Sequence, residues 1–217
     1  MAQYNDAGIW LSAKADQRLY ERWEFSAELA TRMDQNFTGI SSMFTDLSAE
    51  YEVAKPLDVS ATYRLGLTPD DEGYFMHRQR WAFDATAGEK FGDIKVSYRL
   101  RYQAANRGVS SFEGTRTYDV AYRNKLGLTW DINKKWDIDG SVEFWTERED
   151  VNWLVSDLRV KVGFDHRLKK RRYISGGIIH QRHISGVDAR EYIVYFGYSY
   201  SLKRIRKKDD TSLPDDE

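Results

Sequence analysis

The residues of this sequence that could carry chemistry fall into a scattered group and a periodic group. The scattered group is His183, Ser185 and Glu191, the three side-chain types of a nucleophilic triad. In such a triad a histidine takes the proton of a serine hydroxyl, and a carboxylate orients the histidine. The remaining histidines do not have the spacing of metal ligands: His77, His166 and His180. We expect no catalytic centre, no metal site and no cofactor.

The periodic group consists of acidic and basic residues at every second position, in segments whose alternate positions are apolar. Buried charges persist when they are paired, so facing acids and bases predict an internal salt-bridge network. A less conservative interpretation is a transverse field across a narrow water-filled pore. The residues that we expect to form this lumen network, structural or pore-lining, are Asp46, Glu50, Arg64, Arg78, Arg80, Arg99, Arg101, Arg123, Asp139, Glu143 and Arg159.

A period of two indicates β-strands with one apolar and one polar face. Thr117 to Glu147 shows it most clearly, as two alternating arms joined by a short polar turn. If Trp130 faces Trp136 across this turn, Arg123 lies opposite Glu143, an opposite-charge cross-strand pair.

Hairpins of this kind recur along the chain. Short, mostly basic turns alternate with longer loops at 34–41, 68–74 and 105–114. This arrangement is typical of one sheet wound up and down. In the hairpin where Val53 faces Leu57, Asp46 falls opposite Arg64. Eleven strands can be counted, whereas bacterial single-chain barrels have an even number, so ten to twelve are expected.

Composition supports this interpretation. The 217 residues contain no cysteine, which excludes disulfides and thiolate metal sites, and the net charge of −1 argues against a nucleic-acid partner. No run of 18 apolar residues exists that could form a transmembrane helix. We therefore predict an all-β chain: a single antiparallel up-and-down transmembrane β-barrel over residues 1–202, with lipid outside and a charged, side-chain-filled lumen. Residues 203–217 are expected to form a charged, disordered tail.

The chain starts without a charged and then apolar leader, and we expect that a signal peptide was removed, because a barrel must be exported. Barrels of this class place short turns in the periplasm. The aromatic residues expected at that interface are Trp23, Trp136 and Tyr173, with Trp81, Trp145 and Trp153 available to either aromatic girdle. The expected location is the bacterial outer membrane, with lipid as the principal partner.

Three resemblances add to these expectations. Tyr195, Gly197, Tyr200 and Leu202 on the last predicted strand resemble the C-terminal signal read by the barrel-assembly machinery, although the chain continues beyond it. Trp10 and the stretches 22–33 and 57–67 resemble the outer-membrane barrel family called domain of unknown function 2490. That resemblance implies a Gram-negative, often Bacteroidetes, outer-membrane barrel and implies no activity.

The third resemblance is faint and concerns His183, Ser185 and Glu191, which are similar to the triad of the barrel lipid A deacylases with a shorter His–Glu separation. We expect instead a largely plugged barrel that is structural or a subunit of an outer-membrane assembly with other envelope proteins. The alternatives are a narrow pore for small polar solutes or ions, an outer-leaflet lipid-modifying enzyme, and a lipocalin-like carrier. The carrier needs an apolar interior that this alternation does not provide.

Overall fold

The computed structural model describes residues 4–70, 72–106, 118–149, 152–185 and 189–205, and the secondary structure in these ranges consists of eleven β-strands. Among the described residues, no helix is long and apolar enough to cross a membrane. The strands are β1 (Tyr4–Leu19), β2 (Trp23–Asp34), β3 (Gly39–Ala54), β4 (Leu57–Pro69), β5 (Phe75–Phe91), β6 (Ile94–Asn106), β7 (Tyr118–Asn133), β8 (Trp136–Glu149), β9 (Asn152–Lys169), β10 (Arg172–His183) and β11 (Ala189–Ser201).

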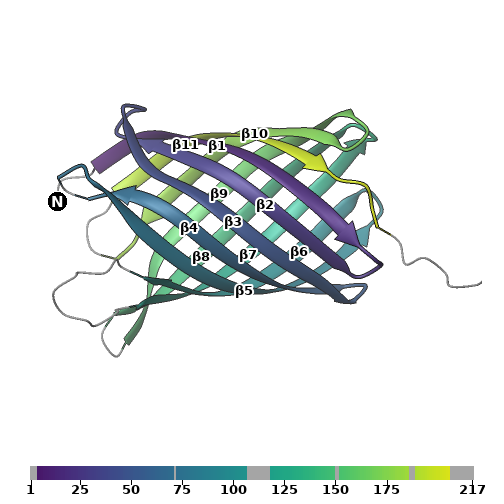
Figure 1. Ribbon diagram of the computed structural model, residues 1–217, viewed down its shortest axis with the longest axis horizontal. Helices are drawn as coiled ribbons and strands as arrows, with labels where there is room; N and C mark the ends of the chain where they lie inside the picture. The colour runs from purple at the N-terminus through teal and green to yellow at the C-terminus, as the bar shows by residue number, and fades with distance from the viewer. Residues whose placement is uncertain (1–3, 71, 107–117, 150–151, 186–188, 206–217) are drawn as a thin grey trace, which may run out of the picture.

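The strands form one closed barrel in which each strand pairs with its neighbour in sequence and β1 pairs with β11 (Figure 1). Consecutive strands are antiparallel, whereas the β1–β11 pair is parallel, with Trp10 beside Tyr195. An odd number of up-and-down strands leaves the first and last strands running in the same direction, so only a parallel pair can close the barrel. The count of eleven is therefore correct, and the expectation of an even number is wrong for the described chain.

The short turns lie at one end of the barrel, and the residues after β11 continue along that end. The Leu202 amide donates to the Asp16 carbonyl at 2.7 Å, and the Ile205 amide donates to the Arg18 carbonyl at 3.1 Å. The Tyr20 amide in turn donates to the Ile205 carbonyl at 2.8 Å. Ile205 thus forms an isolated bridge with Leu19 at the end of β1, beyond the last strand. Residues 206–217 lie outside the described ranges, so the boundary at 202 and the tail stay predictions.

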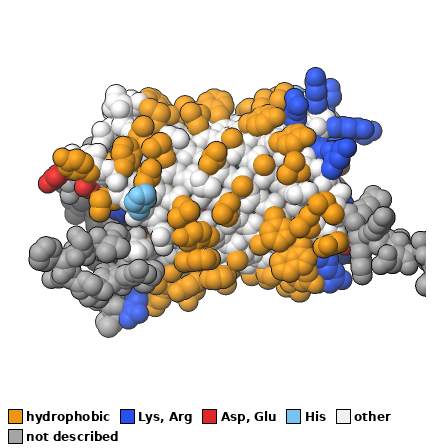
Figure 2. Space-filling model, in the orientation of Figure 1, with side chains coloured by type: hydrophobic (Ala, Val, Ile, Leu, Met, Phe, Trp, Pro, Cys, Tyr) orange, Lys and Arg blue, Asp and Glu red, His pale blue; other side chains and the backbone are white. Residues whose placement is uncertain are grey.

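The outer face of the barrel is apolar, as the alternation predicts (Figure 2). Large apolar side chains are exposed on every wall, and Leu126 on β7 is 57% exposed. Asn124 interrupts the apolar set on β7, and its Oδ1 accepts a hydrogen bond from the Tyr98 hydroxyl at 2.6 Å. This bond lowers the cost of placing an amide on an apolar surface. Lys and Arg side chains gather at the end that carries the short turns (Figure 2).

One predicted register is confirmed and one is wrong. Asp46 pairs directly with Arg64 between β3 and β4. Between β7 and β8, however, Trp130 pairs with Ile138, because the register shifts at the turn between Asp131 and Asn133. Lys125 therefore lies opposite Glu143, two residues from the predicted partner. A shift of two residues keeps every side chain on its predicted face.

Two of the predicted interfacial aromatic residues point into the lumen instead. The Trp145 ring contacts the Arg123 guanidinium, 4.1 Å from the ring centroid, just before the register shift between β8 and β9. Tyr173 pairs with Arg167 and lies against its guanidinium at 5.3 Å, on the inward face of β9 and β10. Both tyrosine and tryptophan are amphipathic, so composition alone does not fix the face that they occupy.

Close packing across β9, β10 and β11 depends on glycine. Tyr195 stands beside Gly177, which pairs with Gly163 on the next strand. A Cβ atom at Gly177 would overlap the carbonyl oxygen of Val162 and lie 2.6 Å from the Cα of Gly163. The absence of both side chains therefore leaves room for the Tyr195 ring.

This packing predicts that Gly177→Ala destabilises the barrel by about 1–3 kcal/mol, the usual cost of overpacking. The matched control is Gly140→Ala, because the nearest heavy atom to a Cβ there is 3.9 Å away. Denaturant unfolding of the two variants in detergent would measure the difference. Equal unfolding midpoints would show that the glycines are not required for packing.

Candidate functional site

The lumen contains two cavities that share Trp10, Arg32 and Arg159. The cavity halfway along the barrel has a volume of about 350 Å³ and is strongly cationic. Its charged lining residues are the cations Arg32, Arg64, Arg99, Arg123, Lys125, Arg159 and Lys161 and the carboxylates Glu28 and Glu143. The lumen is therefore not completely filled by side chains, in contrast to the expectation from the sequence.

The second cavity, of about 330 Å³, lies towards the loop end of the barrel. The charged residues that line it are mainly acidic, unlike those of the first cavity: three carboxylates, Asp6, Asp34 and Glu191, stand against two cations, Arg32 and Arg159. The charges of the lumen thus change from mixed and acidic near the loop end to cationic midway. The lumen charge therefore varies along the barrel axis, and the transverse separation that the sequence suggested stays a prediction.

Glu143 is the centre of the ion pairs in the cationic cavity. Its carboxylate accepts from Arg99 at 2.7 Å and from Arg123 at 2.7 and 3.2 Å, and Arg159 lies 3.8 Å away. Glu143 and Arg123 are only 4% and 6% exposed, respectively. The predicted Arg123–Glu143 pair is therefore confirmed, although it forms diagonally across the strands rather than directly.

Other predicted network residues form pairs elsewhere on the lumen wall. Arg64 contacts Asp46 through two hydrogen bonds of 2.5 and 2.6 Å, which confirms this pair, and Arg101 holds Asp84 in the same way at 2.6 Å. Asp139 pairs with Lys161 at 3.2 Å. Bidentate contacts of this kind are the stronger class of ion pair. Two further predicted residues, Glu50 and Arg78, are exposed and do not line the cavity.

Among the described residues, no ion pair or hydrogen bond is made by three of the half-buried inward cations: Arg32, Arg80 and Lys125. Arg80 was expected in the network, and it lies beside Arg64 in the β4–β5 register. Both Arg64 and Arg123 repel it. The middle of the lumen thus holds more positive charge than the described carboxylates neutralise.

Arginines and aromatic rings alternate around the lumen in a stack that we call the arginine–aromatic ladder. Its order is Arg64, Phe44, Arg32, Trp10, Arg159, Trp145 and Arg123. The distances from guanidinium carbon to ring centroid range from 3.3 Å for Arg64 over Phe44 to 5.0 Å for Arg159 over Trp10. All lie within the range of cation–π attraction.

Sequence reasoning placed three ladder residues, Arg64, Arg123 and Arg159, in the network and missed the others. Trp10 and Phe44 occupy the parity that is otherwise polar, on β1 and β3. A large aromatic residue on the charged face of a strand was the available signal. Its partners could not be inferred, because they come from strands that are far apart in sequence.

The three residues that resemble a triad are not arranged as one. His183 Nδ1 lies 2.6 Å from Asp157 and Nε2 lies 3.3 Å from Glu191, so both ring nitrogens face carboxylates. Ser185 follows β10 and its amide bonds to the Ser156 carbonyl at 3.4 Å. Within the described part of the chain, no group of three or more His, Asp or Glu side chains is arranged to hold a metal ion.

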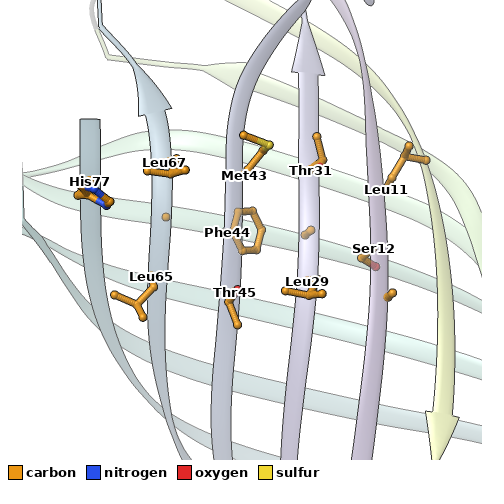
Figure 3. Close-up of a pocket in the computed structure, with 13 residues that line it drawn as sticks. Leu11, Ser12, Leu29, Thr31, Met43, Phe44, Thr45, Leu65, Leu67 and His77 are labelled. Carbon is orange, nitrogen blue, oxygen red and sulfur yellow. The ribbon is translucent and has the colours of Figure 1, made fainter. Parts of the chain in front are cut away.

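A third depression, of about 730 Å³, lies on the outer wall formed by β1 to β5. Its lining is mainly apolar and includes Leu11, Leu29, Met43, Leu65 and Leu67 (Figure 3). No cluster of charged groups converges there, so the lumen is the better candidate for a polar solute.

Comparisons with known proteins agree with the fold. A family model described as "Protein of unknown function (DUF2490)" matches residues 7–189, whereas no curated protein matches significantly. The NanC porin structure is similar with a TM-score of 0.53 and 12% identity, over 87% of this chain and 91% of that chain. At this identity the similarity shows a shared barrel fold and nothing more.

Two further solved structures are more distant. The beta domain of the Bordetella autotransporter BrkA has a TM-score of 0.45 and 13% identity, over 83% of each chain. An anion-selective porin from Comamonas acidovorans has a TM-score of 0.40 and 15% identity, over 82% of this chain and 52% of that chain. Neither similarity is close enough to carry an argument about this chain.

The position of Glu143 generates a test of the ion-pair network. Glu143→Gln leaves three guanidiniums without their shared carboxylate, and breaking a buried pair costs about 3–5 kcal/mol. Asp131→Asn is the control, because it removes the carboxylate of the exposed Lys90–Asp131 pair and should change stability little. Chemical denaturation in detergent would compare them. An equal effect of both variants would contradict the central role of Glu143.

Proposed function

Since the chain belongs to the DUF2490 family, whose description assigns no activity, we propose from the barrel itself that it is a narrow outer-membrane pore for small anions. The observation that carries this proposal is the pair of adjoining lumen cavities with a cationic lining midway. A structural plug would neutralise its charges locally, whereas a pore for anions keeps an excess of positive charge.

Location in the outer membrane is supported by the distribution of side chains. The outer surface is apolar along the strands, the lumen is charged, and the short turns share one end of the barrel. This is the arrangement that lipid outside and a polar interior require of a transmembrane barrel. In this orientation the short turns and residue 205 face the periplasm, and lipid is the main partner of the wall.

Three cations that lack an ion-pair partner among the described residues favour anions over cations in the pore: Arg32, Arg80 and Lys125. Rings of positive side chains select anions because the surrounding low-dielectric wall strengthens their field. The cavity volumes limit the solute to a small one. The acidic residues at the loop end attract cations instead, so the preference for anions must arise midway along the lumen rather than at the mouth.

Two other functions are less well supported. A plugged barrel or an assembly subunit would account for the many ion pairs, but it would not account for the two cavities in the lumen. An enzyme that modifies outer-leaflet lipids would need a histidine free to activate Ser185, and His183 is held between Asp157 and Glu191. We therefore propose no catalytic role.

Conductance in planar bilayers tests the pore. The purified barrel should give ion-selective single-channel steps with a reversal potential that favours chloride in a KCl gradient. Lys125→Gln should weaken this preference, because a unit charge passing within about 4 Å in water contributes roughly 1 kcal/mol, or roughly fivefold in ion occupancy. The control is Lys170→Gln at the β9–β10 turn. Absence of steps, or cation selectivity, would overturn the proposal in favour of the plugged barrel.

Contact with lipid can be tested separately from conduction. Leu126→Arg, halfway along β7, should cost about 2–4 kcal/mol if it lies at the bilayer midplane. Val120→Arg near the loop end of the same strand should cost only about 0–1 kcal/mol. Reversible folding into phosphatidylcholine vesicles would measure both. A barrel that folds and stays in solution without detergent or lipid would contradict the membrane location.

A further inference from the structure

Arg32 differs from the other arginines of the arginine–aromatic ladder. Arg64 is held by Asp46, Arg123 by Glu143, and Arg159 by the Gln181 side chain. Arg32 instead contacts ring faces: its guanidinium carbon lies 4.0 Å from the Trp10 ring centroid and 4.9 Å from the Phe44 ring centroid. Its hydrogen-bond donors have no partner among the described residues.

The surroundings of Arg32 favour a negative charge. Arg64, Arg159 and Arg123 repel it, and the strongest attraction from a described carboxylate comes from Asp46, which is already bonded to Arg64. A buried guanidinium without a counter-charge is costly. A bound anion would remove this cost for Arg32 and would also reduce the repulsion among the neighbouring arginines.

The position is also accessible to a solute. Arg32 lines both lumen cavities, as do Trp10 and Arg159. Arg159 lies over the same Trp10 ring at 5.0 Å, so two guanidiniums approach one aromatic platform. A solute moving between the cavities therefore meets this group of three residues.

We propose that Arg32, supported by Trp10 and Arg159, forms a binding site for a small organic carboxylate. A guanidinium donates two parallel hydrogen bonds to the coplanar oxygens of a carboxylate, and a spherical ion does not use this geometry. The stacked rings fix the plane of the guanidinium and provide apolar contacts for the carbon skeleton of the solute. This inference rests on the proposed pore and assigns the solute class of the same lumen.

Calorimetric titration of the refolded barrel in nonionic detergent with sodium acetate tests the site. Saturable binding is expected, with sodium chloride a much weaker competitor at equal ionic strength. Arg32→Lys keeps the charge and loses the planar fork, so acetate affinity should fall at least tenfold. Arg22→Lys in the β1–β2 turn is the matched control and should bind as the native barrel does.

The outcomes are separable. Unchanged acetate affinity in Arg32→Lys, or equal competition by chloride, would overturn the site. Tighter binding of inorganic phosphate than of acetate would overturn the assignment to carboxylates. If Arg32→Lys does not refold, Arg32→Met keeps an unbranched stem between the rings and should abolish acetate binding; retained binding would contradict the proposal.

Conductance of the same proteins distinguishes this inference from the pore itself. Acetate binding by a barrel without channel activity would support the site and refute the pore. Channel activity without saturable acetate binding would refute the site and leave the pore intact.

Discussion

Closure is the constraint on which the rest of this structure depends. In a closed barrel every backbone group can pair with a neighbouring strand, and each side chain has only two directions available. Because the outer wall is apolar, the polar half of each strand must point inwards. The lumen is consequently crowded with charges, and their mutual neutralisation decides which side chains are held and which are not. Two arrangements stabilise these crowded charges: ion pairs of Glu143 with its arginines, and stacking of guanidiniums on aromatic rings in the arginine–aromatic ladder.

The sequence was sufficient to predict the walls and insufficient to predict the neighbours across the lumen. Alternation identified the strands, and a simple count along one hairpin placed Asp46 opposite Arg64. The register shift near the β7–β8 turn carries no clear signal in the residues, so the pairing of Lys125 with Glu143 was missed. Trp145 shares the parity of Glu143 on β8, so alternation did indicate its inward position, and its aromatic type led us to expect it in a girdle instead. Contacts such as Trp10 with Arg159 depend on strand tilt and closure, which local patterns do not specify.

The incomplete filling of the lumen has a physical origin in its composition. Apolar side chains can interdigitate to crystal-like density, whereas like-charged guanidiniums and ammonium groups keep one another apart. Lys125 and Arg80 face other cations, so the side chains that could close the cavity repel one another instead. In a barrel of the same width with an aliphatic interior, side chains would fill the lumen cavity. The charged interior therefore keeps space for water and solutes while it also holds the wall in register.

Because of its topology, the parallel β1–β11 pair is expected to form last in folding. Every other pair joins strands that are consecutive in sequence, whereas this pair brings together the two ends of the described chain. Loop-closure entropy disfavours such distant contacts until the intervening hairpins exist. One part of the ladder, from Arg64 to Trp10, lies on β4 to β1, and the other, from Arg159 to Arg123, lies on β9 to β7. Each part involves neighbouring strands, whereas Trp10 and Arg159 meet across the β1–β11 side of the barrel, so we expect that contact to form only when the barrel closes.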